Sequence, residues 1–167
     1  MTQKTERSVL LVKPEAVRYE SQIFQELVAR GFASIQRVGE ASLEKIDAEA
    51  LAAMLYPEAN AALLKAVYDH FWNQRMTWLI VGAPDALQKL STLVGADPDP
   101  AKCTAGTLRA RFFAAEGKPK MLPSLLNDPD TGLNFEYHYN GFLCPRTEEE
   151  LGRWFESGVF YKTARAA

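Results

Sequence analysis

The stretch Ser8-Val-Leu-Leu-Val-Lys-Pro-Glu-Ala-Val17 joins a short, mostly apolar run to an abrupt stop. Residues 8–12 suit a buried strand, because the apolar run has strand length and ends at a turn signal. Lys13-Pro14 ends this strand, since proline fixes its own backbone angle and has no N–H to donate. A lysine at a strand end can lie in a cleft and present a positive charge to phosphate, or it can be an ordinary surface residue.

Apolar spacing predicts three further strands and a series of helices along the rest of the chain. The strands are expected over residues 33–38, 77–81 and 134–139, and the helices over 23–28, 47–55, 61–71, 84–94 and 147–155. Residues 95–107 and 113–133 are expected to form long loops. This order predicts an α+β fold, in which a four-stranded antiparallel sheet carries helices on one face in the ferredoxin-like arrangement.

Length and composition limit the class of protein. The chain has 167 residues, which suits a single domain over 1–167 with its own hydrophobic core. A formal net charge of −2 argues against a dedicated nucleic-acid-binding protein. Two cysteines, Cys103 and Cys144, make neither a disulfide framework nor a zinc site. The polar first residues precede no apolar run long enough for a signal peptide or a membrane span, so the expected location is the cytoplasm.

Two other segments could carry chemistry. In Gly106-Thr-Leu-Arg109, an arginine after a glycine turn could hold phosphate through two parallel hydrogen bonds, or it could be a surface residue. In residues 134–145, which read NFEYHYNGFLCP, six residues alternate like a strand before Asn140-Gly141 interrupts the pattern. His138 lies near the end of that strand, where it could act in chemistry or be a structural or solvated side chain.

Three segments, in this order, resemble the nucleoside diphosphate kinase family: SVLLVKPEAV at 8–17, TLVGADPDPAKCTAGTLRARF at 92–112 and NGFLCPRTEEELGRWF at 140–155. The resemblance implies the ferredoxin-like core of that family and assembly as a homo-oligomer. It also implies nucleoside di- and triphosphates as ligands, with Mg²⁺ bound alongside the nucleotide and no membrane partner. Members of the family pass the γ-phosphate of a triphosphate through a phosphohistidine to a diphosphate.

The resemblance assigns roles to four residues. Lys13 matches a lysine that faces the phosphates, and Tyr56 falls about where the family has a tyrosine beside the catalytic histidine. Arg109 matches an arginine that contacts the phosphates. Glu150 matches the glutamate that accepts a hydrogen bond from the second nitrogen of the catalytic histidine.

The departures from the family pattern bear directly on activity. Ser91 stands where the family has a phosphate-binding arginine, and Asp97 stands where it has a phosphate-contacting threonine. Asn140 aligns with the nucleophilic histidine, and Tyr137 aligns with an asparagine that binds ribose. His138 lies two residues before Asn140, so on a strand the two side chains share a face but are roughly 6–7 Å apart. The loop at 113–133 is longer than in typical members, which indicates an insertion.

Three functions remain open on these grounds. The first is a nucleotide-binding protein of this fold in which Lys13, Arg109 and Asn140 contact the ligand and transfer is weak or lost, because an amide is not a nucleophile. The second is an active nucleoside diphosphate kinase that uses His138. The third is a non-enzymatic oligomeric scaffold.

Overall fold

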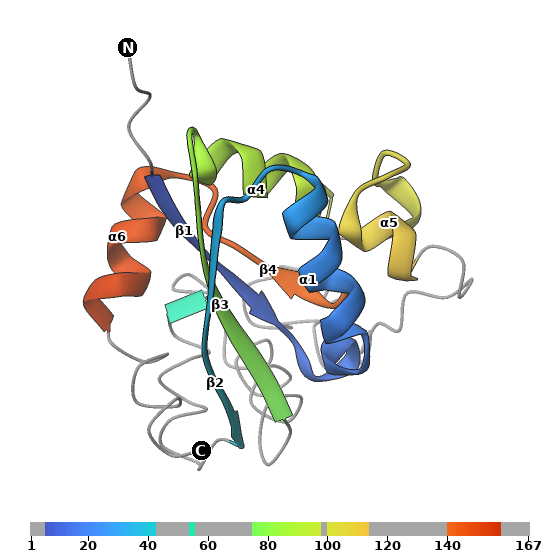
Figure 1. Ribbon diagram of the computed structural model, residues 1–167, viewed down its shortest axis with the longest axis horizontal. Coiled ribbons are helices and arrows are strands. Elements are labelled where there is room, and N and C mark those ends of the chain that lie inside the picture. Colours follow the sequence, from blue (N-terminus) through green and yellow to red (C-terminus); the bar gives the residue numbers. More distant parts are fainter. Residues whose placement is uncertain (1–5, 43–53, 56–74, 98–99, 114–139, 158–167) are drawn as a thin grey trace, which may run out of the picture.

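The computed structural model describes residues 6–42, 54–55, 75–97, 100–113 and 140–157 (Figure 1). Within these ranges the strands are β1 Glu6–Val12, β2 Ser34–Ser42, β3 Arg75–Ala83 and β4 Phe142–Leu143. They form one sheet in the order β2-β3-β1-β4, and all three neighbouring pairs are antiparallel. The prediction of an α+β fold with a four-stranded antiparallel sheet is confirmed.

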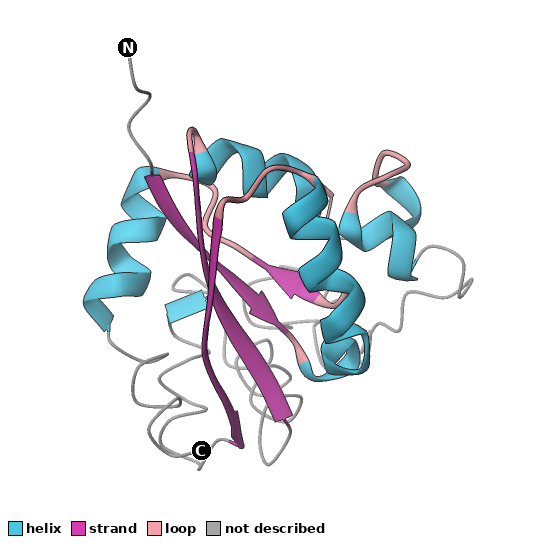
Figure 2. Cartoon of the chain, viewed as in Figure 1, coloured by secondary structure: helices cyan, strands magenta, loops and turns pink. Residues whose placement is uncertain are grey.

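Three of the helical segments match predicted helices with shifted ends. They are η1 Pro14–Tyr19, α1 Glu20–Ala29, α4 Ala86–Val94, η2 Pro100–Lys102, α5 Leu108–Phe113 and α6 Glu148–Ser157 (Figure 2). Helices expected over 23–28, 84–94 and 147–155 are therefore confirmed, and η1, η2 and α5 were not predicted. The helix expected at 61–71 and the strand expected at 134–139 lie outside the described residues, as do most of the helix expected at 47–55 and all but the first residue of the loop at 113–133.

The last described strand, β4, was not predicted. It begins just after Asn140-Gly141, where the sequence pattern breaks, and it pairs with the end of β1 through Leu11↔Leu143 and Val12↔Phe142. A strand of two residues is too short to show an alternating pattern, so its pairing with the central strand defines it rather than its own sequence.

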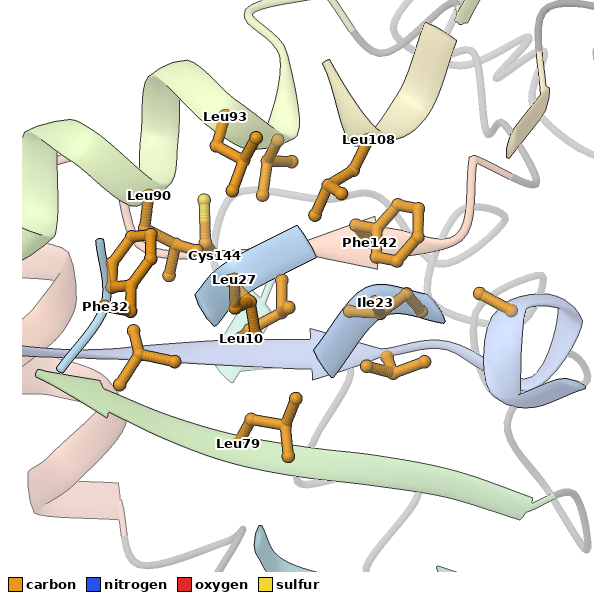
Figure 3. Packing of buried hydrophobic residues seen from close by; sticks show 14 of the residues in the cluster. Leu10, Ile23, Leu27, Phe32, Leu79, Leu90, Leu93, Leu108, Phe142 and Cys144 are labelled. Carbon is orange, nitrogen blue, oxygen red and sulfur yellow. The ribbon is translucent and has the colours of Figure 1, made fainter. Parts of the chain in front are cut away.

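Both faces of the sheet are covered, which corrects the prediction of helices on one face only. On one face the core cluster joins apolar side chains of β1 and β3 to those of α1, α4 and α5 (Figure 3). On the other face, Trp154 of α6 packs edge-on against Trp78 of β3, with ring centroids 6.1 Å apart. Residues Val9 to Val12 of β1 are all fully buried, and a strand that is apolar on both sides requires a cover on both.

The described helices are too short or too polar to cross a lipid bilayer. Cys103 and Cys144 are free thiols.

Candidate functional site

The candidate site lies where β1 and β4 leave the sheet side by side. Lys13 follows β1 with an extended backbone. Pro14 is the first residue of η1, where a backbone N–H would have no partner within the helix, so proline loses no hydrogen bond there. The Lys13 N–H donates to the Gly141 carbonyl at 2.9 Å, which carries the β1–β4 pairing one residue beyond the strands. Gly141 has a φ of +80°, in the region that favours glycine. This backbone link brings Lys13 and Asn140 together although they are 127 residues apart.

Four residues at this point form what we call the Lys13 cluster: Lys13, Glu15, Asn140 and Gly141. The Lys13 Nζ donates to Asn140 Oδ1 at 3.0 Å and lies 3.6 Å from Glu15 Oε2. The same Glu15 oxygen accepts the Gly141 N–H at 3.3 Å. Lys13 is fully buried and Asn140 is 4% exposed. The cluster is therefore a small buried polar network inside an otherwise apolar end of the sheet.

Burial decides the protonation behaviour of Lys13. Loss of hydration lowers the pKa of Lys13 to about 8 from its usual 10.5, because a charge is poorly stabilised away from water. Glu15 opposes this shift, and the positive charge of Arg109 adds to it. A substantial fraction of Lys13 is therefore neutral at mildly alkaline pH.

Arg109, on α5, has a different environment from the one a phosphate ligand would need. Its Nη1 donates to the carbonyls of Gly95 and Asp97 at 3.2 and 3.0 Å, and its Nη2 donates to the Phe142 carbonyl at 2.8 Å. The residue is 4% exposed. Arg109 therefore ties the turn after α4 to the start of β4, and its direct contact with phosphate stays a prediction.

A second arginine, Arg146, reaches the same turn and was not singled out from the sequence. Its Nη1 donates to both the carbonyl and the hydroxyl oxygen of Ser91 at 2.7 Å, and its Nη2 donates to the Gly95 carbonyl at 2.6 Å. Arg109 and Arg146 thus share one carbonyl, which places their charges close together. The sequence signal for Arg146 is faint, because it depends on the serine at position 91, which is 55 residues away.

Arg146 keeps part of its guanidinium available. Within the described segments, neither its Nε–H nor the second N–H of Nη2 has a hydrogen-bond partner, and the side chain is only half-buried. These two N–H groups lie along one edge of the guanidinium, the edge that binds a carboxylate or phosphate through two parallel bonds. Arg146 can therefore receive an oxyanion without breaking its contacts to Ser91 and Gly95.

Glu150 lies behind Arg146 rather than beside Asn140. Its Oε2 accepts the backbone N–H of Arg146 at 3.1 Å, in the first turn of α6. No contact between Glu150 and the Lys13 cluster occurs among the described residues. Asp97 contributes its carbonyl to Arg109 and to the thiol of Cys103, which donates to it at 3.1 Å. Tyr56, Tyr137 and His138 lie outside the described residues.

A surface groove of about 700 Å³ lies next to this region, between α4 and residues 104–107. Ser91, which holds Arg146, also lines the groove, together with Arg30 and Lys89. The described residues contain no group of three carboxylate, histidine or cysteine side chains that could hold a metal ion. The chemistry available here is the binding of anions by cations.

No family model matches this sequence, and no curated protein matches it. Solved structures share its fold. The nucleoside diphosphate kinase of Aquifex aeolicus superposes with a TM-score of 0.65 at 14% identity over 94% of each chain. A halophilic nucleoside diphosphate kinase from Halobacterium salinarum in complex with CDP gives 0.63 at 18% identity, over 94% of this chain and 88% of that one.

A third structure, of the nucleoside diphosphate kinase from Borrelia burgdorferi with bound vanadate and ADP, gives a TM-score of 0.59 at 17% identity. It covers 92% of this chain and 86% of that one. The chain therefore has the fold of the nucleoside diphosphate kinases over nearly its whole length.

Proposed function

We propose that this chain binds the phosphates of a nucleoside di- or triphosphate beside the end of β1, with phosphoryl transfer weak or lost. The observation that carries the proposal is the grouping of Lys13, Arg109 and Arg146 around the turn after α4 and the start of β4. Three cations held this close attract a polyanion strongly. The fold adds support, because two structures of the same fold hold nucleoside diphosphates.

Within this proposal the two arginines have different tasks. Arg146 contacts the phosphates through its open edge, while Arg109 holds the 95–97 turn that positions Arg146. Lys13 adds positive charge without contacting the phosphates, and its ammonium group is held in place by the hydrogen bond to Asn140 Oδ1. The backbone carbonyl of Asp97 accepts from Arg109 and helps to hold this turn.

Weak transfer follows from the chemistry of Asn140. Its amide cannot accept a phosphoryl group as imidazole can, and its oxygen accepts from Lys13. The alternative, an active kinase with His138 as the nucleophile, requires that side chain to reach the phosphates from two residues away. Incubation with γ-labelled ATP separates the two: a phosphoprotein that is acid-labile, alkali-stable and absent from His138→Ala establishes the active kinase. Its absence from wild-type chain supports the proposal.

Mg²⁺ belongs to the ligand in this proposal. The described site offers cations, and its carboxylates are engaged: Glu15 with Lys13 and Gly141, and Glu150 with the backbone N–H of Arg146. Mg²⁺ in nucleotide sites is held largely by phosphate oxygens and water. The metal would therefore enter as the magnesium nucleotide.

Arg146→Ala tests the binding site directly. Two charge-assisted hydrogen bonds are lost, each worth roughly 1.5–3 kcal/mol, so we expect ADP affinity to fall by about 10- to 150-fold for each bond in calorimetric titration. Arg37→Ala is the matched control, because Arg37 pairs with Glu20 on the far edge of the sheet. Equal affinities of wild type and Arg146→Ala would refute the assignment of Arg146.

A homo-oligomer fits one further observation. Phe24 and Val28 of α1 are 46% and 55% exposed, and they border a groove that continues to Ile35 on β2, an edge strand of the described sheet. Exposed apolar surface beside an edge strand is typical of subunit contacts. We propose a second copy of this chain as the occupant. Phe24→Glu should then reduce the mass measured by light scattering; an unchanged mass would place the contact elsewhere.

A further inference from the structure

The Lys13 cluster contains the three groups needed to form a covalent cross-link. The Lys13 amine is a nucleophile when neutral, the Asn140 carboxamide has an electrophilic carbon, and the Glu15 carboxyl can move protons between them. The amine lies 3.0 Å from Asn140 Oδ1 and 3.6 Å from Glu15 Oε2. These three side chains suffice for the exchange of one amide for another without a ligand or a metal.

The geometry puts the reacting atoms close together. Because a C=O bond is about 1.23 Å long, the Lys13 Nζ lies no more than about 4.2 Å from the Asn140 Cγ. A near-attack arrangement needs about 3–3.5 Å, which a small rotation of either side chain supplies. Both side chains are held in place, since Lys13 is fully buried and Asn140 is 4% exposed.

Burial also favours the reactive forms. An apolar environment penalises the charged amine more than the neutral one, which is why the pKa of Lys13 is lowered. Water, the competing nucleophile, is largely kept from Asn140. A backbone amide such as that of Gly141, whose N–H is held by Glu15, is a weaker nucleophile than an amine.

We propose that Lys13 and Asn140 form an intramolecular isopeptide bond with Glu15 as the proton shuttle. The Glu15 carboxylate takes a proton from the lysine ammonium, and the nitrogen lone pair then attacks the Asn140 Cγ. Glu15 passes the proton to the amide nitrogen, the bond from Cγ to that nitrogen breaks, and the carbonyl is restored. The departing ammonia takes the second proton from the lysine nitrogen and leaves as an ammonium ion. One ammonium and one carboxamide thus give one secondary amide and one ammonium ion, without oxidation or reduction.

The bond goes beyond nucleotide binding and does not depend on it. It consumes the charge of Lys13, so a cross-linked chain has only Arg109 and Arg146 in the cation cluster. Formation of the bond would therefore lower phosphate affinity permanently in each molecule in which it occurs. Nucleotide binding and cross-linking compete for one nitrogen atom.

Mass spectrometry of the full chain tests the proposal. We expect wild-type chain to be lighter by one ammonia after prolonged incubation, with one branched tryptic peptide joining the segments that contain residues 13 and 140. Pro14 already keeps trypsin from cutting after Lys13, so the branched peptide is the readout. Asn140→Asp should give the same branched peptide with loss of water instead. Lys13→Arg should retain its full mass.

Glu15→Gln tests the shuttle, and Glu20→Gln is its control, because Glu20 pairs with Arg37 outside the cluster. We expect the branched peptide to be lost in the first variant and kept in the second. Wild-type chain at full mass with separate, linear peptides would overturn the proposal. Ammonia loss without a branched peptide would also overturn it, because it would indicate attack by the Gly141 nitrogen on Asn140. If Glu15→Gln fails to fold, the wild-type peptide map alone decides.

Discussion

Replacement of Gly141 by alanine is the most direct probe of how the site is assembled. Gly141 has a φ of +80°, and a Cβ built there would lie 2.2 Å from Cε2 of Phe113 and 3.1 Å from Cβ of Ala16. The Phe113 ring cannot swing away freely, because it packs edge-on against Phe142 and Tyr19. Gly141→Ala therefore has to displace a buried aromatic group or the backbone that carries Asn140.

Two separate costs set the expected size of the effect. A left-handed backbone costs an alanine roughly 1–2 kcal/mol, and overpacking of a core costs about 1–3 kcal/mol. We expect the free energy of unfolding to fall by about 2–5 kcal/mol. With an m-value of about 2 kcal/mol/M, the urea midpoint should fall by roughly 1–2.5 M.

Gly152→Ala is the matched control in urea denaturation. A Cβ at this position in α6 meets nothing within 4 Å, so the same substitution should stabilise the helix by about 1 kcal/mol at most. A Gly141→Ala midpoint within error of wild type would refute the reasoning, and so would an equal loss in both variants.

Three other predictions concern the buried groups. Between pH 8 and 10.5 the unfolded chain binds more protons at Lys13 than the folded chain does. The free energy of unfolding of wild-type chain with an unreacted Lys13 amine should therefore rise with pH across this range, by up to about 3 kcal/mol relative to Lys13→Met. Parallel urea titrations of the two chains would check this. Trp154→Ala should cost about 3–5 kcal/mol by loss of the buried contact with Trp78, and a loss under 1 kcal/mol in thermal unfolding would contradict that packing. Chains that carry the Lys13–Asn140 bond should have a free energy of unfolding about 5 kcal/mol higher than that of unreacted chains, because a link across 127 residues lowers the entropy of the unfolded chain. Equal urea midpoints of the two fractions would contradict this.

The parts of the fold that were predictable are those with a strong local pattern. β1 and β3 are continuous apolar runs buried on both faces, and α4 combines apolar spacing with a glycine at its end. The sequence predicted that α4 begins at Pro84, but it begins at Ala86. The residue before it, Asp85, has a backbone conformation in the left-handed region. Local composition indicated the element but not its first residue.

The parts that were missed depend on contacts far apart in the chain. β4 exists because Phe142 and Leu143 meet the end of β1, and neither residue signals a strand by itself. Arg109 was recognisable as a functional candidate, but the three carbonyls to which it donates come from separate segments. Arg146 follows a proline in an irregular stretch, and only the position of Ser91 shows what it does.

The strand order has a consequence for how the chain is made. β1 is the first strand of this sheet to be synthesised, yet one of its neighbours, β4, comes from nearly the end of the sequence. At about 5–20 residues per second, a ribosome needs roughly 6–25 s to add the 127 residues that separate Lys13 from Asn140. During that interval a strand whose Val9 to Val12 are fully buried in the finished fold has an unpaired edge, and pairings of this range form slowly. Chaperone demand during synthesis should therefore be concentrated on β1.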